Sequence, residues 1–279
     1  MLSVVIPSFN TAEMTLRCVR AVADGVLVVE AVEVIVVDDG STDDTASRVA
    51  PFARVIRLER NSGFAVAANR GVSEARGDII LLLNSDAIVQ PGAIVALVAA
   101  FDDAQLGIAG AQLLNEDGSP QWSGGPKPTL LWLLAVVSGL GGVLGRLRRG
   151  APRTGRVDWV SGAAMAFRAE VWRDAGPLDE SFRFYCQDLE LCIRARTKGW
   201  DVRIVAEARV THAMGATIAA GSELHHDPAK LWSDLADWAR VGLLGRWALV
   251  VAGSLRALVT RDPAVRAGVR ALLRGSVSS

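Results

Sequence analysis

The sequence predicts an α/β fold with a right-handed, mostly parallel sheet. Two patterns indicate this class: short apolar runs alternate with helical segments through short connections, and polar clusters follow the runs where strands would end. The 279 residues, of which 51% are hydrophobic and 22% charged, are enough for one large domain or two modest ones. That composition excludes a disordered tail, a collagen-like chain and a disulfide-stapled mini-protein.

The first half of the chain alternates between strand and helix signals. Residues 34–37 are a continuous run of β-branched residues, typical of a parallel strand buried on both faces. Pro7 is expected to end the first strand, and Asn10 with Glu13 forms a capping box for the first helix. Pro91 is expected in the first turn of a later helix. The expected strands are residues 3–6, 34–37, 54–58 and 79–83, and the expected helices are 10–23, 64–75 and segments beginning near 42 and at 91.

Beyond residue 107 the alternation is lost. Strands are expected at 108–114, 159–166 and 201–205, helices at 170–175 and 188–198, and a turn at 115–118 with a positive φ at Gly118. Residues 128–145 carry no charge for 18 residues, the lower limit for crossing a bilayer, but four glycines weaken the second half as a helix. We therefore expect a short buried or membrane-facing helix there. Two amphipathic helices are expected over residues 229–275, separated near residues 261–263.

Cysteine usage and charge distribution bound the compartment and the partners. Cys18, Cys186 and Cys192 are odd in number and lack C-x-x-C spacing, which favours a reducing compartment and argues against a zinc ribbon. With no signal-peptide pattern at the N-terminus, we expect a cytoplasmic protein. The net charge is zero, so we expect no nucleic-acid partner. However, residues 1–120 hold 8 basic and 16 acidic residues, whereas residues 241–279 hold 6 and 1.

Three polar clusters follow expected strands: residues 7–10, 38–41 and 84–86. In open parallel sheets, ligands bind at the carboxyl ends of the strands, so these clusters predict one site. The glycine fingerprint G-x-G-x-x-G and a P-loop lysine are both missing from the first strand–helix connection. A diphosphate would therefore be held through a divalent metal, for which Asp86 can supply carboxylate oxygens.

These clusters belong to a longer series of motifs: V-V-I-P-S-F-N, V-V-D-D-G-S-T-D, N-S-G-F-A-V-A-A-N-R-G, I-L-L-L-N-S-D, V-S-G-A-A-M-A-F-R, F-Y-C-Q-D-L-E-L-C-I-R and V-T-H-A-M-G. In this order they resemble a family 2 glycosyltransferase of the GT-A fold, and particularly the rhamnosyltransferase-like enzymes of bacterial cell-surface polysaccharides. The resemblance covers residues 1 to about 215. It implies a catalytic domain over 1–215, with a nucleotide-binding half at 1–106 and an acceptor and catalytic half at 107–215. Residues 216–279 would be a helical extension.

The resemblance assigns residues to the nucleotide-sugar. Asp39 lies where the family's acidic residue hydrogen-bonds the nucleotide base. The alternatives are that Asp39 only caps the next helix, that Gly63 only serves its turn and that Asn69 is a satisfied helix side chain. The residues expected to contact the donor are Pro7, Ser8, Asn10, Asp39, Asn61, Gly63, Asn69, Asn84 and Asp86.

A divalent metal, Mn²⁺ or Mg²⁺, is the cofactor that the resemblance implies. Asn84-Ser85-Asp86 stands at the place of the family's D-x-D motif, with Asn84 replacing the first carboxylate. Asp86 would contact the metal and His212 would complete its shell. The alternatives are an aspartate that closes a turn and a structural histidine.

Asp188 matches the family's general base, which takes the proton of the acceptor hydroxyl. Gln187 stands where the family has glutamate, which lessens the upward push on the Asp188 pKa. Glu190 is expected to face elsewhere on the helix. Trp159 and Gly162 are the expected acceptor contacts, with Trp122 and Trp172 as further stacking candidates, although buried tryptophan is the commoner explanation.

The implied reaction is a single in-line displacement with inversion at the anomeric carbon. The first donor to expect is dTDP-L-rhamnose, followed by UDP-sugars, and the acceptor is a glycan or a polyprenyl-diphosphate-linked sugar. The arginine-bearing tail predicts peripheral contact with the inner face of the plasma membrane, or else a homo-oligomer interface or a solvated helix. A catalytically silent GT-A-like scaffold subunit and a sugar nucleotidyltransferase stay open as alternative functions.

Overall fold

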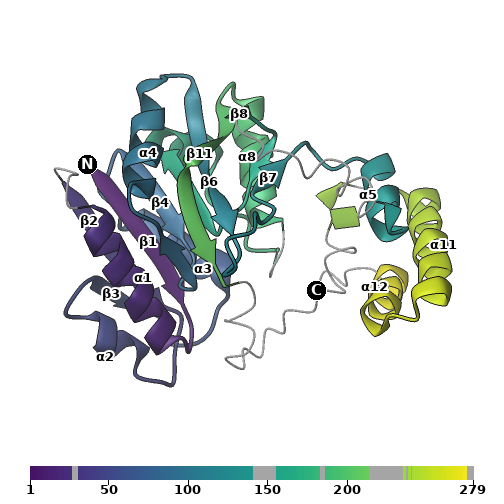
Figure 1. The fold of residues 1–279 in the computed structure, drawn as a ribbon, viewed down its shortest axis with the longest axis horizontal. Helices are drawn as coiled ribbons and strands as arrows, with labels where there is room; N and C mark the ends of the chain where they lie inside the picture. Colours follow the sequence, from purple (N-terminus) through teal and green to yellow (C-terminus); the bar gives the residue numbers. More distant parts are fainter. Residues whose placement is uncertain are drawn as a thin grey trace. The chain divides into compact units, whose positions relative to one another are not determined.

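The computed structural model of the chain describes residues 1–26, 31–140, 155–182, 186–213, 235–236, 238–239 and 241–274. Its main element is a nine-stranded sheet in the order β3-β2-β1-β4-β10-β6-β11-β5, with β8 paired to β11 (Figure 1). Strands β1 (Leu2–Ser8), β2 (Val32–Asp38), β3 (Arg54–Arg57) and β4 (Ile79–Leu83) are mutually parallel. The predicted α/β class with a mostly parallel sheet is confirmed.

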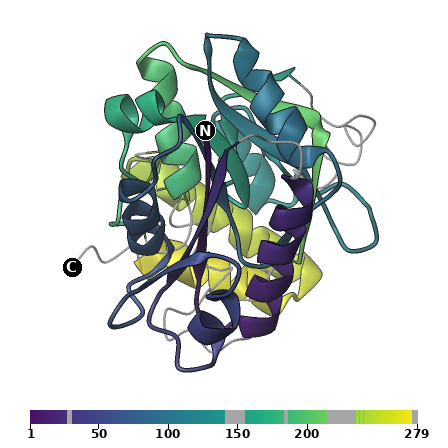
Figure 2. The same cartoon turned by 90° about the vertical axis from the view of Figure 1, so that its left-hand side faces the viewer.

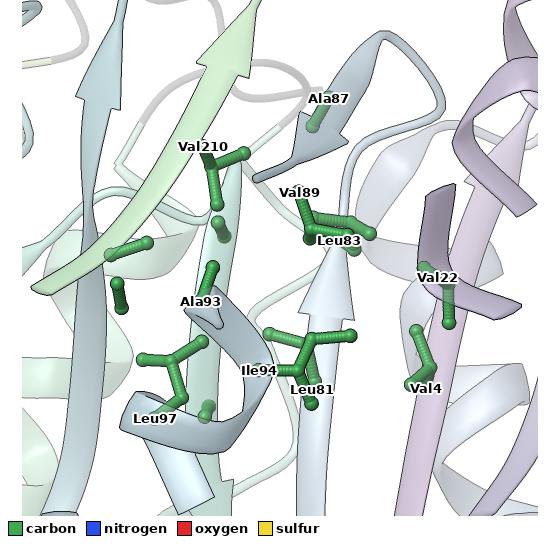
Figure 3. Close-up of a cluster of buried hydrophobic side chains, with 14 of the residues drawn as sticks. Val4, Val22, Leu81, Leu83, Ala87, Val89, Ala93, Ile94, Leu97 and Val210 are labelled. Atoms are coloured by element: carbon green, nitrogen blue, oxygen red, sulfur yellow. The ribbon is translucent and has the colours of Figure 1, made fainter. Parts of the chain in front are cut away.

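Helices cover both faces of this parallel part (Figure 2). On one face, Val4 and Ile6 pack into the same cluster as α1 (Ala12–Gly25) and α4 (Ala93–Ala99). Figure 3 shows Ile94 and Leu97 of α4 beside Leu81 of β4 in this cluster. On the other face lies α3 (Phe64–Ser73), where a Cβ added at Gly71 would collide with Val5 and Val37. Successive side chains of a strand point to opposite faces, so one short run of valines and isoleucines serves both layers.

The second half of the sheet has mixed strand directions. Strand β10 (Ala164–Arg168) is antiparallel to β4 and to β6 (Leu106–Leu114), and β11 (Asp201–His212) is parallel to β6. The short β5 (Ala87–Val89) closes the order, antiparallel to β11. The other described elements of this unit are α2 (Thr45–Val49), the 3₁₀ helix η1 (Ala100–Asp102), β7 (Gly124–Gly125), β8 (Gly155–Arg156), β9 (Trp159–Val160), α7 (Ala169–Ala175) and α8 (Gln187–Thr197).

Several sequence-based expectations at the start of the chain are wrong in detail. Strand β1 runs through Pro7 to Ser8. Its pairing with β4 ends at Val5, so the missing backbone N–H of Pro7 removes no hydrogen bond to β4. The capping box does not form: Asn10 has φ 50°, and the N-cap of α1 is Thr11, without a side-chain cap hydrogen bond. Helix α2 begins at Thr45 rather than near residue 42.

Two further strands also differ from expectation. The expected strand 159–166 is broken into β9 and β10, and residues 161–163 lie between them. The short strand β5 occupies residues just before Pro91, so α4 begins at Ala93 after Gly92 rather than at the proline. The positive φ predicted at Gly118 is confirmed at 79°.

A second compact unit comprises residues 127–152, 184–186 and 226–279. Its described helices are α5 (Leu130–Val137), α11 (Leu243–Thr260) and α12 (Pro263–Arg274). The predicted break near residues 261–263 is present, with Arg261 at φ 53°. Within the apolar segment 128–145, α5 is short and buries Leu133 and Val137, whereas residues 141–145 lie outside the described residues. Among the described helices, α11 is long and apolar enough to cross a membrane.

Candidate active site

The carboxyl end of β2 forms a buried carboxylate clamp around the loop that precedes α3. Both oxygens of Asp39 accept hydrogen bonds, Oδ1 from the backbone N–H of Ser62 and Oδ2 from that of Gly63, each at 2.8 Å. Burial raises the pKa of Asp39 above its ordinary value, and the two backbone donors act against this rise. Gly40, at φ 74°, permits the close approach, because a Cβ there would lie 2.5 Å from the backbone of Arg60.

The loop after β1 lies against the same turn. Asn10 Oδ1 accepts a hydrogen bond from the N–H of Thr42 at 2.8 Å, and the N–H of Asn10 donates to the Ser41 hydroxyl. The backbone of Asp39 donates to the carbonyl of Ser8, which joins the ends of β1 and β2. Ser8 itself is buried, and its hydroxyl is hydrogen-bonded to Thr15 at 2.7 Å. Pro7 is also buried, so Asn10 is the more accessible residue of this loop.

The predicted donor residues on α3 and the loop before it divide into two groups. Asn61 and Gly63 lie at the Asp39 clamp, since the N–H of Gly63 also donates to Asn61 Oδ1 at 3.2 Å. Asn69 lies further along α3 and faces another segment: its side chain accepts from the N–H of Leu178 at 2.9 Å and donates to the carbonyl of Leu178 at 3.0 Å. The amide of Asn69 therefore ties α3 to the loop after α7 and is not brought to the clamp.

The turn after β4 brings Asn84 and Asp86 to His212, the last residue of β11. Asp86 Oδ1 and Asn84 Nδ2 each lie 3.3 Å from His212 Nε2. The carbonyl of Asp86 also accepts a hydrogen bond from the N–H of Ala213. These contacts confirm that residues 128 positions apart in sequence meet at the carboxyl end of the sheet. A pocket of about 340 Å³ reaches Asp86 between α1, β5 and the end of β11.

Gln121 fixes the orientation of His212, and no sequence motif drew attention to it. Its Oε1 lies 3.1 Å from His212 Nδ1, and its Nε2 donates to the His212 carbonyl at 2.6 Å. A proton on Nδ1 satisfies Gln121 Oε1 and leaves Nε2 as an acceptor that faces both the Asn84 amide and Asp86 Oδ1. The useful signal in the sequence would have been a polar side chain just after the turn at 115–118, where the chain returns along the end of β6.

The Asp86 and His212 side chains fit a divalent metal in part. Asp86 Oδ1 is buried and has no hydrogen-bond partner among the described residues, and it lies 3.3 Å from His212 Nε2, the ring nitrogen that the Asn84 amide also approaches at 3.3 Å. A cation between the two would satisfy both atoms. No group of three histidine, cysteine or acidic side chains suited to a metal occurs within the described ranges. The protein thus offers one carboxylate, one imidazole and the neutral Asn84 amide, with further ligands left to the diphosphate and water.

Asp188 lies in the first turn of α8, beside the break between β9 and β10. Its Oδ2 accepts from the N–H of Gly162 and its Oδ1 from the N–H of Leu189, both at 2.8 Å. Burial raises the pKa of Asp188, and the two backbone donors oppose this rise without cancelling it. A Cβ at position 162 would lie 3.3 Å from the Asp188 Cβ, so glycine gives this carboxylate its room.

The neighbours of Asp188 have separate partners. Gln187 is buried and donates to the carbonyl of Phe182, and Glu190 pairs with Arg194 at 2.6 Å. Trp159 is only 8% exposed and donates its indole N–H to the carbonyl of Pro126. Trp122, 56% exposed, packs edge-on against Trp159 with ring centroids 5.0 Å apart, and so presents more open ring surface. Trp172 is stacked on Phe167.

Comparisons with known proteins place the chain among sugar-transferring enzymes. The model of the family described as "Glycosyl transferase family 2" matches residues 3–153. An N-acetylglucosaminyl-diphospho-decaprenol L-rhamnosyltransferase of Mycobacterium tuberculosis is 29% identical over 253 residues, which cover 78% of this chain and 80% of the relative. The succinoglycan biosynthesis protein ExoU of Rhizobium meliloti is 29% identical over 240 residues, covering 79% of this chain and 63% of the relative.

Solved structures share the fold at lower identity. The mannosyltransferase PcManGT from Pyrobaculum calidifontis, in complex with GDP-Man and Mn²⁺, aligns with a TM-score of 0.61 at 17% identity. That alignment covers 99% of this chain and 81% of the other. S. aureus TarS 1-349 aligns with a TM-score of 0.57 at 17% identity, covering 97% and 88%. The catalytic sheet therefore has the GT-A fold.

Proposed function

Because the chain belongs to glycosyl transferase family 2, we propose that it moves a sugar from a nucleotide-diphospho-sugar to a polyprenyl-linked glycan in cell-surface polysaccharide synthesis. The observation that carries the proposal is the meeting of Asn84, Asp86 and His212 at the strand ends. The Asp39 clamp follows β2, which only β1 separates from β4 in the sheet. The similarity to an L-rhamnosyltransferase over most of both chains supports dTDP-L-rhamnose as the first donor to test, with UDP-sugars next. Residues 1–215 would carry the reaction.

Asp39 and the loop residues Asn10 and Asn61 would receive the nucleotide. Each oxygen of Asp39 already accepts one backbone hydrogen bond and has a second lone pair for a base N–H. The clamp also holds the loop before α3 in place, so the nucleotide would meet a preformed edge. This assignment makes Asp39 both a positioning group and a contact to the base.

Asp86 and His212 would hold a divalent cation, Mn²⁺ or Mg²⁺, together with the donor diphosphate. When bound, such a cation neutralises the charge that grows on the departing diphosphate. Gln121 keeps the His212 lone pair directed toward Asp86, and Asn84 adds a neutral donor or acceptor at the same point. With one carboxylate fewer than the D-x-D pattern, this chain would bind the cation more weakly than a two-carboxylate site.

Asp188 would act as the general base in an inverting displacement. The acceptor oxygen attacks the anomeric carbon, its proton passes to the Asp188 carboxylate, and the bond from that carbon to the diphosphate oxygen breaks. The electron pair of the broken bond leaves with the nucleoside diphosphate, so no covalent enzyme intermediate is required. The raised pKa of Asp188 makes its carboxylate a stronger base than a solvated aspartate.

The experiment incubates the purified chain with Mn²⁺, a polyprenyl-diphosphate-linked N-acetylglucosamine acceptor and either dTDP-L-rhamnose or a UDP-sugar, and follows product and free nucleotide by chromatography. We expect transfer from one donor class, and loss of transfer in Asp188→Asn with nucleotide binding retained. General-base removal typically costs about 10²–10⁴-fold in rate. Glu190→Gln, on the same helix but paired with Arg194, serves as the control and should keep most of the activity. Equal activity in Asp188→Asn would refute the assignment of the base.

A lipid-linked acceptor would require work at a membrane surface, and we assign the protein to the cytoplasmic side of the plasma membrane. The same acceptor class is named for the Mycobacterium tuberculosis relative. Fractionation of cells in low-salt buffer tests this placement. Recovery of all the protein in the soluble fraction would contradict it.

A further inference from the structure

The outward side of α11 is an apolar surface with no packed partner among the described residues. We call this surface the α11 face and define it by its large exposed side chains: Leu243, Leu244, Trp247, Val251, Leu255, Leu258 and Val259, between 54% and 88% exposed. At 100° per residue, six of the seven lie within one stripe along the helix. Apolar patches of this kind on a helix surface mark sites of protein or membrane contact.

The charged and packed residues of α11 lie on the opposite side. Leu249, Val250 and Ala257 are buried there, and α11 contacts both α5 and α12. Arg256 turns inward, where its Nη1 donates to the carbonyl of Val136 in α5 at 3.1 Å. The α11 face therefore contains no charged residue, although α11 itself carries two arginines.

The neighbouring helix α12 supplies positive charge. It buries Val265, Val269 and Leu272 and exposes Arg266 and Arg270, one helical turn apart. Residues 241–279 hold six basic residues and one acidic residue. The unit thus presents a long apolar surface together with a local excess of positive charge.

We propose that the α11 face docks on the surface of an anionic lipid bilayer, with α11 lying in the plane of the membrane. Charge decides between this occupant and a second copy of the chain: the exposed arginines of α12, which packs against α11, attract anionic headgroups, but they would disfavour the close approach of a second, equally basic copy. Trp247 suits the boundary between headgroups and acyl chains.

The geometry of the helix favours docking in the plane over spanning. Its 18 residues extend about 27 Å, slightly less than the ~30 Å hydrocarbon core. One side of α11 is already occupied by α5 and α12, and Arg256 is bonded within that packing. A helix with one apolar side free and the other side packed or charged is typical of interfacial binding. The arginine-bearing tail expected to contact lipid comprises both helices; in this proposal α11 makes the apolar contact and α12 supplies the charge.

The test measures flotation of the full chain with phosphatidylcholine vesicles, with and without phosphatidylglycerol. We expect the unchanged protein to float with the anionic vesicles. For Val251→Asp we expect a partition coefficient lower by about tenfold or more. The matched control is Val95→Asp on α4, which changes an equally sized side chain that is 39% exposed and should leave flotation unchanged. The double variant Arg266→Glu, Arg270→Glu should lower partition onto the anionic vesicles by about thirtyfold or more.

Three results would overturn the proposal: no flotation with either vesicle, equal losses in Val251→Asp and Val95→Asp, or a dimer in light scattering that Val251→Asp dissociates without any lipid binding. The last result would identify a second copy as the occupant. Vesicle binding is measured without donor or acceptor, so its failure is distinguishable from failure of the proposed sugar transfer. Circular dichroism of each variant verifies that the helices are formed.

Discussion

At the scale of single residues, Asp188 is a carboxylate that the fold keeps poorly solvated. Two backbone donors hold it, yet burial still raises its pKa. Both effects suit the general base that we propose, which must be positioned and must also accept a proton. Gln187 beside it is uncharged, and desolvation rather than like-charge repulsion sets the direction of the shift.

This shift predicts the pH dependence of the reaction. A base works only when ionised, so the rate must rise as the pH increases through the raised pKa of Asp188. We expect the acidic limb of kcat above the ordinary aspartate value of 3.8. Steady-state rates across the acidic range test this prediction. Asp39 also has a raised pKa, but it would change nucleotide affinity, so nucleotide dissociation constants over the same range serve as the control. An acidic limb at or below the ordinary value would contradict the assignment.

Gln121 provides a second prediction at this scale, because it is the described partner of His212 Nδ1. In Gln121→Ala the ring loses the hydrogen bond that keeps its Nε2 lone pair toward Asp86. We expect the Mn²⁺ concentration for half-maximal activity to rise by about 10–100-fold, with a smaller loss of kcat at saturating Mn²⁺. Gln90→Ala is the matched control, since Gln90 bonds the adjacent Thr211 and not His212. Unchanged metal dependence in Gln121→Ala would show that this glutamine is only structural.

At the scale of elements, the site depends on where strands end and break. Residues 161–163 interrupt the run that sequence patterning treats as one strand, and this interruption aims the Gly162 N–H at Asp188. Strand β11 runs to His212 and carries that side chain to Asp86. A strand break and a strand extension therefore bring Asp188, Asp86 and His212, the proposed base and the proposed metal ligands, to one edge of the sheet.

The break predicts the effect of Gly162→Ala. The φ of Gly162 lies outside the left-handed region, so alanine strains no backbone angle, but its Cβ would lie 3.3 Å from the Asp188 Cβ. The carboxylate must shift, and misplacement by about 1 Å can cost 10²-fold in rate. We expect kcat to fall by roughly 10–100-fold while nucleotide affinity and melting temperature change little. Gly242→Ala, where a Cβ would meet nothing within 4 Å, is the control. An unchanged kcat would separate this contact from catalysis.

These elements also show what the sequence can and cannot predict. Continuous apolar runs predicted β2 and β4 well, because a strand buried on both faces needs apolar residues at successive positions. The expected end of the last strand at residue 205 was wrong, since Glu207 and Arg209 lie on exposed positions of a strand that continues with a bulge. Asn10 and Glu13 match a capping box in spacing, but Asn10 hydrogen-bonds the neighbouring loop instead. Contacts between distant segments decided each of these cases.

In the candidate site too, residues within motifs could be predicted and contacts between distant segments could not. Asp39, Asp86, Asp188 and His212 could be predicted from their positions within the sequence motifs. The structure brings Asp86 to His212 and Asp39 to residues 62–63. Gln121 and the tie between Asn69 and Leu178 were beyond reach of the sequence, because each contact joins segments about 90 to 110 residues apart. The residues that can bind a ligand can be predicted from their types and motifs. The residues that hold them in place, such as Gln121, depend on which distant segments the fold brings together.

At the scale of the whole molecule, the zero net charge hides an uneven distribution. The first 120 residues carry twice as many acidic as basic residues, and residues 241–279 carry six basic residues against one acidic residue. Asp39 and Asp86 belong to the acidic part, where the nucleotide base and a divalent cation are proposed to bind. Arg266 and Arg270 belong to the basic part, on the helix that packs against α11. The two functions use opposite charges in two compact units of one chain.

Ligand binding should therefore be visible in the stability of the whole chain. A ligand that binds only the folded state stabilises it by mass action, about 2.7 kcal/mol at a concentration one hundred times its dissociation constant, which corresponds to a rise of several degrees in Tm. We expect a nucleoside diphosphate with Mn²⁺ to produce such a rise in a thermal-shift measurement, and chelation by EDTA to reduce it. In Asp86→Asn the metal-dependent part of the rise should be lost, because the buried Oδ1 is the carboxylate that faces His212. Asp102→Asn, an exposed residue on η1, should behave as the unchanged protein does. A full rise in Asp86→Asn, or the same rise with and without EDTA, would show that the diphosphate is held without a cation. The charge opposing the diphosphate would then have to come from basic side chains of the protein.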